Sequence, residues 1–299
     1  EFIIYVNMLT WPVTVVGWLT SIIQQAEASQ KRINDFLKES PSIKDGNGSA
    51  NVKNGEIEFR NVSLTYPETK IKALNNVSFK IKAGETIGVL GKVGAGKTSL
   101  LELITRLYDP NEGEVLIDGQ NLKLFNLNEL RKSIGYVPQN PFLFSESISN
   151  NIKFGKNNAT NKEIENAANN ASIDKEIKKL KNGYQTILGE RGVTLSGGQV
   201  QRISIARALI KNPNIILLDD CLSAVDTDTE EIILKSLYKY SEKKTTLIVS
   251  HRISSMKSAD SIIVFKNGNV IEQGGHNELM ENESYYSRLY NKQQSEQNK

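Results

Sequence analysis

The sequence contains very little cysteine or histidine. Its 299 residues include one cysteine, Cys221, and two histidines. A single cysteine excludes an internal disulfide framework and is typical of a reducing, cytosolic environment. So few cysteines and histidines leave almost nothing from which to build a structural zinc site, so a bound metal is expected to be a hard cation with oxygen ligands.

An excess of charge of one sign is missing as well. The 37 basic and 34 acidic residues leave a formal net charge of +3, which excludes the strongly basic surface that would indicate nucleic acid as the main partner. The sequence is 38% apolar, which excludes the composition of a disordered chain. Its length is enough for roughly two domains of about 150 residues each, and no internal repeat is apparent.

A long apolar run is present at the start of the sequence. Residues 2–26 carry no charged side chain, and a bilayer core needs about 20 mostly apolar helical residues. A buried helix of a soluble protein or a signal peptide would also be apolar, but the basic start and small-residue cleavage site of a signal peptide are missing. We therefore predict a membrane span. Because the chain starts inside this run, it is expected to be a fragment of a longer protein.

Composition divides the chain into four parts. Residues 1–39 are predicted to form the end of a transmembrane helix and its amphipathic cytoplasmic extension. Residues 40–55 are rich in Gly, Asn, Ser and Lys, which is the composition of a flexible linker. A folded domain is expected over residues 56–293, followed by a polar tail at residues 294–299.

The folded domain alternates strand and helix patterns. Residues 55–66 and 75–82 alternate apolar and polar side chains, as half-buried antiparallel strands do. Short continuous apolar runs predict buried parallel strands. These runs are residues 86–91, 133–139, 214–220 and 245–251. Residues 261–274 predict a hairpin, because Asn267-Gly268 suits a type I′ turn, and a helical insert is expected between about residues 141 and 192. We predict an α/β fold with a small antiparallel sheet and a helical subdomain.

A glycine-rich loop follows the strand expected at residues 86–91. Residues 91–98 match G-x-x-x-x-G-K-[ST] and precede a helical pattern. Glycines let backbone N–H groups approach phosphates, the lysine supplies charge to the β- and γ-phosphates, and the hydroxyl ligates Mg²⁺. A turn that merely joins strand to helix is the alternative, but the complete motif in this context favours a P-loop NTPase. The candidate nucleotide-binding residues are Gly91, Lys92, Val93, Gly94, Ala95, Gly96, Lys97, Thr98 and Ser99.

Two other motifs admit a structural and a functional interpretation. Asp219 ends an apolar strand, where it would face the metal of the phosphate loop, although a strand followed by a solvated acidic turn looks the same. Ser196 and Gln199 fit the capping box S-x-x-Q of a helix. Gly197 and Gly198 between them would make that helix terminus an open anion site. The residues alone do not decide between cap and anion site.

Together, residues 91–98, the LSGGQ segment at residues 195–199, Asp219 and Ser250-His251 resemble the nucleotide-binding domain of an ABC transporter. The resemblance extends from Glu56 to Tyr290. In that family two such domains sandwich two ATP molecules head to tail, so the LSGGQ segment of one faces the P-loop of the other. The resemblance therefore implies ATP and Mg²⁺ as cofactors. It also implies contacts to the ATP of a partner domain from Ser196, Gly197, Gly198 and Gln199.

The resemblance assigns roles to residues that carry no motif by themselves. Tyr66 matches the residue that stacks on adenine, Gln139 the loop glutamine at Mg²⁺ and the attacking water, and His251 the switch histidine at the γ-phosphate. Without the family they would be an ordinary strand tyrosine, loop glutamine and structural histidine. Residues 223–226 match the loop through which the two domains contact each other, or they cap the helix that follows. The implied Mg²⁺ ligands are Thr98, Gln139 and Asp219.

Two features resemble exporters in particular. Residues 188–192 resemble a short exporter loop that touches the cytoplasmic ends of membrane helices. The apolar helix fused in front of the domain resembles the last span of an exporter half, whereas importers usually carry the ATPase as a separate chain. The resemblance thus implies export of drugs, lipids or other amphipathic small molecules across the plasma membrane. The ATPase domain would lie on the cytoplasmic side with a second ABC half-transporter as partner and no nucleic acid.

Asp220 departs from the family pattern. It stands where most hydrolytic members have Glu, so its carboxylate reaches about 1.5 Å less far. Misplacing a catalytic group by about 1 Å can cost roughly a hundredfold in rate. We predict the weak-site half of a heterodimeric exporter. The alternatives are a homodimer in which Asp220 still positions water, a soluble ABC ATPase without transport, and a sensor that binds ATP without hydrolysing it.

Overall fold

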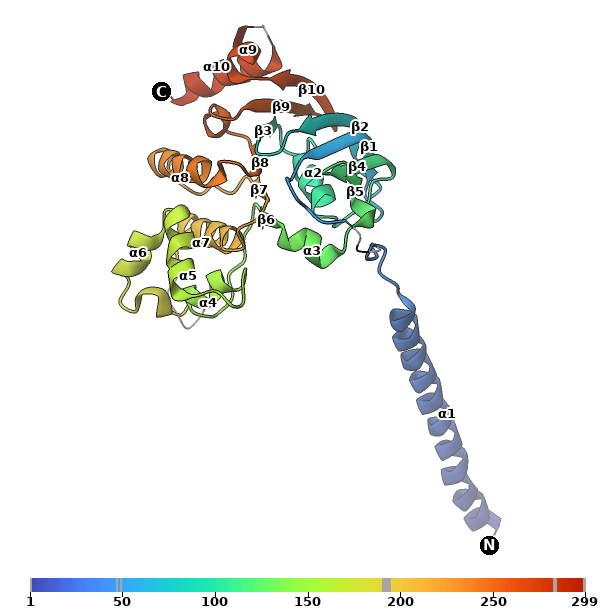
Figure 1. The fold of residues 1–299 in the computed structure, drawn as a ribbon. Helices are drawn as coiled ribbons and strands as arrows, with labels where there is room; N and C mark the ends of the chain where they lie inside the picture. The colour runs from blue at the N-terminus through green and yellow to red at the C-terminus, as the bar shows by residue number, and fades with distance from the viewer. Residues whose placement is uncertain (1, 47, 49, 190–194, 282–283, 298–299) are drawn as a thin grey trace. The chain divides into compact units, whose positions relative to one another are not determined.

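A computed structural model describes residues 2–46, 48, 50–189, 195–281 and 284–297. The chain forms two compact units, Glu1–Lys44 and Asp45–Lys299. The first consists mainly of helix α1, Phe2–Lys38, none of whose side chains is buried (Figure 1). Its most apolar 18-residue window has a mean hydropathy of 1.6, so α1 is long and apolar enough to cross a membrane.

The second unit begins inside the segment with linker composition. The Asp45 carboxylate accepts a hydrogen bond from the Leu127 backbone N–H at 2.7 Å, the first N–H of helix α3. Ala50 is 2% exposed and forms an isolated parallel bridge with Phe125. These contacts attach Asp45 and Ala50 to the domain, because they satisfy a helix terminus and bury an apolar side chain.

Four strands of the second unit form an antiparallel sheet in the order β2-β1-β4-β5. They are β1 (Ile57–Thr65), β2 (Lys72–Ile81), β4 (Glu112–Ile117) and β5 (Gln120–Asn121). Phe59 of β1 lies opposite Phe79 of β2, and their rings stack with centroids 4.6 Å apart. The antiparallel pair predicted from alternation at residues 55–66 and 75–82 is confirmed.

Six strands form a second sheet in the order β10-β9-β3-β8-β7-β6. They are β3 (Thr86–Gly91), β6 (Ile134–Val137), β7 (Ile215–Asp219), β8 (Thr245–Ser250), β9 (Ser261–Lys266) and β10 (Asn269–Gly274). Neighbours from β9 to β6 are parallel and β10 pairs antiparallel with β9. Asn267 and Gly268 both have positive φ, 51° and 76°, as a type I′ turn requires. The predicted parallel strands and hairpin are confirmed.

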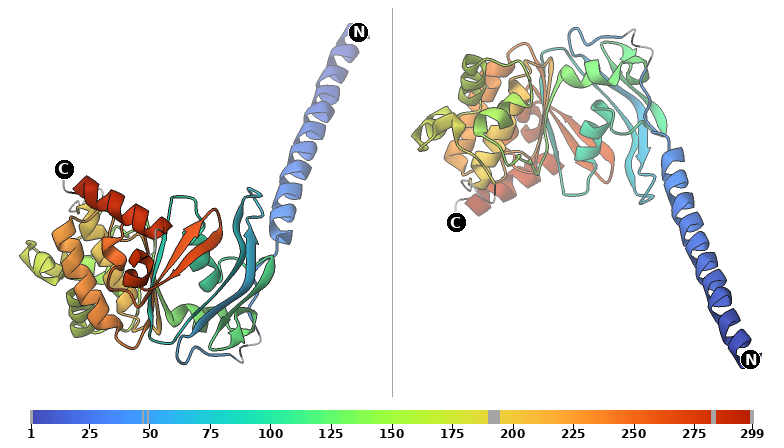
Figure 2. Two further views of the ribbon diagram at one scale, coloured as in Figure 1. Left: turned by 90° about the horizontal axis from the view of Figure 1, so that it is seen from above. Right: turned by 90° about the horizontal axis from the view of Figure 1, so that it is seen from below.

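The parallel strands are buried on both faces. Ile215 and Leu217 of β7 belong to one hydrophobic cluster, and Ile216 and Leu218 belong to another. Alternate side chains of one strand thus enter different cores, which explains the continuous apolar run. Figure 2 shows the four-stranded sheet on one side of this sheet and the helical segment on the other.

Helices fill both of these layers. Helix α2 (Lys97–Ile104) lies in the cluster shared by the two sheets. Helix α3 (Leu127–Lys132) contributes Leu130 to the same cluster. Helices on the other face include the predicted insert, and their buried residues form the second cluster. They are α4 (Ile148–Lys153), α5 (Asn161–Asn170), α6 (Asp174–Lys179), α7 (Gly197–Leu209) and α8 (Thr227–Ser241). Short 3₁₀ turns are Leu122–Leu124, Gly183–Gln185 and Ser254–Met256.

The chain's last helices pack against the six-stranded sheet. Helices α9 (His276–Glu281) and α10 (Tyr285–Gln297) follow β10. Tyr286 of α10 is fully buried in a third cluster that also contains Leu90 of β3 and Ile253. The C-terminal helix is therefore part of the folded domain.

Cys221 lies two residues after the end of β7 and is 3% exposed. Burial raises the pKa of its thiol, because a thiolate would lose its hydration there. The side chain packs as a small apolar group in the cluster of the helical segment.

Candidate active site

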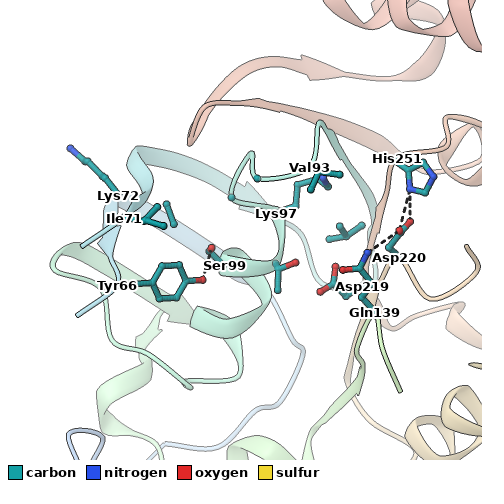
Figure 3. Close-up of a pocket in the computed structure, with 15 residues that line it drawn as sticks. Tyr66, Ile71, Lys72, Val93, Lys97, Ser99, Gln139, Asp219, Asp220 and His251 are labelled. Carbon is teal, nitrogen blue, oxygen red and sulfur yellow. Dashed lines mark hydrogen bonds and ion pairs between the residues drawn. The ribbon is translucent and has the colours of Figure 1, made fainter. Parts of the chain in front are cut away.

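A cavity of about 250 Å³ lies at the carboxyl ends of the parallel strands (Figure 3). Residues predicted from the sequence supply most of its lining. These are Tyr66, Val93, Gly94, Gly96, Lys97, Thr98, Ser99, Gln139, Asp219, Asp220 and His251. Sequence reasoning missed Ile71, Lys72, Ala73 and Val249, which also line the cavity, because no motif marks them. Ligands of α/β sheets bind at this edge.

The loop between β3 and α2 needs glycine at two positions. Gly94 and Gly96 have φ of 79° and 97°, in the left-handed region that favours glycine. A Cβ at Gly96 would lie 2.4 Å from the carbonyl oxygen of Ala73. Within the loop, the backbone N–H of Ala95 donates to the Lys92 carbonyl oxygen at 3.1 Å. The loop therefore packs tightly against the start of β2.

The Lys97 ammonium lies inside this loop. Its Nζ donates to the carbonyl oxygens of Gly91 at 2.8 Å and Lys92 at 3.0 Å. Burial lowers the pKa of Lys97, and the nearby carboxylates of Asp220 and Asp219 oppose that shift. The cavity thus places the Lys97 ammonium near two acidic residues, Asp219 and Asp220.

Asp219 is the last residue of β7 and is 3% exposed. Burial raises the pKa of its carboxyl, and the neighbouring Thr98 hydroxyl opposes that shift. Thr98, Gln139 and Asp219 all line the cavity. A hydroxyl, an amide oxygen and a carboxylate are hard oxygen donors, which is the donor chemistry that Mg²⁺ prefers.

Asp220 and His251 form a pair at the edge of the cavity. His251 Nδ1 lies 3.0 Å and 3.1 Å from the two carboxylate oxygens of Asp220 (Figure 3). A carboxylate only accepts, so Nδ1 carries the hydrogen. Gln139 Nε2 donates to Asp220 over 3.4 Å. Asp220 itself has φ of 44°, and its backbone N–H donates to the Val249 carbonyl oxygen at 2.8 Å. Strand β7 lies between β6 and β8, so the residues that follow these three strands come together.

Tyr66 lies at the opposite end of the cavity, directly after β1 (Figure 3). Its hydroxyl donates to Glu102 at 2.5 Å and lies 2.7 Å from the Ser99 hydroxyl. The rings of Tyr66 and Tyr108 pack edge to face, with their centroids 5.0 Å apart. Burial, together with the Glu102 hydrogen bond, raises the pKa of Tyr66. The phenol is held in one orientation by α2.

Comparison with known proteins identifies the family. The family model described as "ABC transporter" matches residues 74–223, which is half of the chain. The chain belongs to the ABC transporter family. The ABC resemblance expected from the phosphate loop and the LSGGQ segment is thereby confirmed, and the domain around the cavity is the family's ATPase domain.

Several ABC proteins are similar over nearly the whole chain. The "Probable multidrug resistance ABC transporter ATP-binding/permease protein YheI" of Bacillus subtilis is 42% identical over 98% of this chain and 50% of its own length. The "Multidrug resistance-like ATP-binding protein MdlA" of Escherichia coli is 41% identical over 99% of this chain and 50% of its own.

A solved structure described as "a bacterial Atm1-family ABC exporter with ATP bound" shares 34% identity and a TM-score of 0.86. The match covers 97% of this chain and 51% of that one. The chain spans about half the length of the curated relatives it matches.

The LSGGQ segment, residues 195–199, does not line the cavity of its own chain. Ser196 and Gln199 form the capping box of α7: Gln199 N–H donates to Ser196 Oγ at 3.3 Å, and Ser196 N–H donates to Gln199 Oε1 at 3.0 Å. The capping interpretation is therefore confirmed. Gly197 is exposed, and a Cβ at Gly198 would approach the Ala224 carbonyl oxygen to 3.3 Å.

The loop after β7 contacts α7 and leads into α8. The Ala224 N–H donates to the side chain of Gln201 in α7 at 3.3 Å. Asp226 caps α8, because its carboxylate accepts from Thr229 N–H at 2.9 Å. Of the exporter-type loop at residues 188–192, residues 190–192 lie outside the described part of the chain.

Proposed function

We propose that this chain is the MgATP-binding and hydrolysing part of an ABC exporter half. The observation that carries the proposal is a single cavity that unites the P-loop lysine, the buried Asp219 and the Asp220–His251 pair. These groups provide phosphate binding, metal coordination and positioning of water in one place. The substrate would be ATP, and the released energy would drive transport.

The phosphate end of the cavity supplies the charge chemistry. Lys97 would contact the β- and γ-phosphates, and backbone N–H groups of the P-loop would surround them. Thr98, Gln139 and Asp219 would hold Mg²⁺, which when bound neutralises charge on the transferring phosphoryl group. His251 turns Nδ1 to Asp220, so its second ring nitrogen would be the one that contacts the γ-phosphate.

Tyr66 would stack on the adenine base. We expect Tyr66→Ala to weaken ATP binding by roughly 5- to 30-fold, because stacking of a base on an aromatic ring contributes about 1–2 kcal/mol. Fluorescence titration with a labelled ATP analogue measures this. Tyr66→Phe keeps the ring and removes only the hydroxyl contacts to Ser99 and Glu102, so its affinity is expected to stay within about threefold of wild type. Equal losses in both variants would contradict stacking.

Membrane export is proposed from α1 and from the relatives. Helix α1 is apolar, uncharged over residues 2–26 and fused to the ATPase domain. The relatives carry names of multidrug transporters, and the solved structure is an exporter. We propose a plasma-membrane location with the ATPase domain in the cytoplasm. The cargo would be drugs, lipids or other amphipathic small molecules, and not nucleic acid.

The partner is proposed to be a second ABC half-transporter. Ser196 and Gly197 are exposed at the N-terminus of α7 and do not line the cavity of their own chain. They are therefore free to face the ATP of another subunit. The chain combines an intact LSGGQ segment with Asp220 in place of the longer Glu. This combination fits a heterodimer in which the LSGGQ segment completes the partner's ATP site and Asp220 belongs to the weaker ATP site.

Asp220→Glu tests the assignment. In the wild type both carboxylate oxygens of Asp220 lie near His251, and the side chain is one methylene short of the usual Glu. We expect the full-length wild type alone to hydrolyse ATP slowly and Asp220→Glu to raise kcat about 10- to 100-fold. Phosphate release by the purified transporter, with and without a second half-transporter, measures this.

Asp220→Asn is the matched control for the charge. It is expected to bind ATP normally and to lower turnover further. A wild-type kcat of about 1 s⁻¹ or more without any partner would instead support a homodimeric exporter in which Asp220 is an adequate base. ATP binding with no phosphate release by either the wild type or Asp220→Glu would support a nucleotide sensor.

A further inference from the structure

The C-terminal helix α10 is fixed firmly onto the sheet. The Glu272 carboxylate of β10 accepts from the backbone N–H groups of Tyr285 at 2.6 Å and Tyr286 at 3.0 Å, at the start of the helix. The Tyr286 ring is fully buried, and its hydroxyl lies 2.7 Å from His276 Nδ1. These contacts hold the first turn of α10 against the sheet, and the later residues of the helix are placed by that attachment.

Two turns further on, Gln293 reaches the segment that carries His251. Its Nε2 donates to the backbone carbonyl of His251 at 2.7 Å. Its Oε1 accepts from the backbone N–H of Ile253 at 3.0 Å. One planar amide thus bridges the peptide groups on either side of Arg252.

These backbone groups need a partner from outside the sheet. Strand β8 ends at Ser250, and the next turn begins at Ser254. The carbonyl of His251 and the N–H of Ile253 lie between these elements, so neither ladder nor helix satisfies them. Gln293 supplies both an acceptor and a donor at that point.

The His251 segment is held from two sides. On the side of α8, Glu230 accepts from Arg252 Nη1 at 2.5 Å and also from the Ser255 hydroxyl. On the side of α10, Gln293 holds the peptide of His251 itself. Glu230 thus contacts Arg252 and Ser255, whereas Gln293 contacts His251, whose side chain lines the cavity.

We propose that Gln293 is a positioning residue that aims His251 at the γ-phosphate. The inference rests on the γ-phosphate role proposed for His251. Gln293 fixes the backbone, Asp220 fixes Nδ1 of the ring, and together they leave one direction for the other ring nitrogen. The C-terminal helix is thereby coupled to recognition of the terminal phosphate.

The test compares a nucleotide that has a γ-phosphate with one that lacks it. Binding of the non-hydrolysable analogue AMP-PNP and of ADP, both with Mg²⁺, is measured on the full-length protein by calorimetry. Gln293→Ala is expected to weaken AMP-PNP about 3- to 10-fold, as for loss of a hydrogen-bonded contact, and to leave ADP unchanged. Gln294→Ala alters the exposed neighbour on the same helix and is expected to match wild type.

Gln293→Met separates positioning from packing. Methionine has a similar length without hydrogen-bonding capacity, so it is expected to behave like Gln293→Ala. A wild-type ratio of AMP-PNP to ADP affinity in Gln293→Met would overturn the proposal, because packing alone would then suffice. In a His251→Ala background, Gln293→Ala is expected to cause no additional loss; additive losses would also overturn it.

The outcomes separate this inference from the proposed function. If wild type binds neither nucleotide, the nucleotide site itself is wrong. If wild type binds both with preference for AMP-PNP and Gln293→Ala keeps that preference, the site stands and the positioning role of Gln293 is refuted.

Discussion

Gly96→Ala is expected to weaken ATP binding by roughly a hundredfold or more. Gly96 has φ of 97°, and a Cβ there would lie 2.4 Å from the Ala73 carbonyl oxygen. The clash is with backbone, so it is relieved only by moving the P-loop or the start of β2. Both of these are walls of the cavity, and a shift of about 1 Å in a site of this kind can cost a hundredfold. Calorimetric titration with ATP measures the loss.

Gly119→Ala is the matched control. Gly119 has φ of 75°, in the same conformational region, but a Cβ there would meet nothing within 4 Å. We expect about 1–2 kcal/mol of lost stability from backbone strain and unchanged ATP affinity. If Gly96→Ala bound ATP as Gly119→Ala does, tight packing of the loop would not be required for nucleotide binding.

Glu230→Ala is expected to lower the free energy of unfolding by about 2–4 kcal/mol. The Glu230 side chain is 3% exposed, and it accepts hydrogen bonds from Arg252 and Ser255. Its removal leaves a guanidinium and a buried hydroxyl without this partner, which is costly. Arg252 is 32% exposed, so water relieves part of the cost. Urea unfolding followed by circular dichroism measures the difference.

The neighbouring Glu231 provides the comparison. It pairs with Lys235 at 2.7 Å, and both side chains are mostly exposed. Exposed ion pairs contribute little to stability, so Glu231→Ala is expected to unfold at the same urea concentration as wild type. Equal destabilisation by the two substitutions would show that Glu230 does not act through its buried contacts.

The sequence predicts those parts of the fold that depend on local pattern. The run at residues 214–220 is apolar over the strand itself because β7 faces a core on each side, and this is visible without any structure. The Asn267-Gly268 turn is equally local, because only its two left-handed residues are required. The P-loop combines such a pattern with residue types that phosphate chemistry demands.

Contacts between distant elements could not be predicted. The Asp220–His251 pair depends on β7 lying beside β8, and the sequence pattern does not specify strand order. Glu102 stands at an ordinary helix position, and only the folded chain brings it to Tyr66. Ser196 shows the opposite case, since its capping role was readable from spacing alone.

The burial of Cys221 has a practical consequence. Its thiol directly follows Asp220 and is both shielded and held protonated, so reagents such as maleimides react only when the end of β7 opens. It is the one cysteine among the 299 residues of this sequence, so within them the signal comes from this site. Its modification rate would therefore report local opening at the residue next to Asp220 without any engineered label.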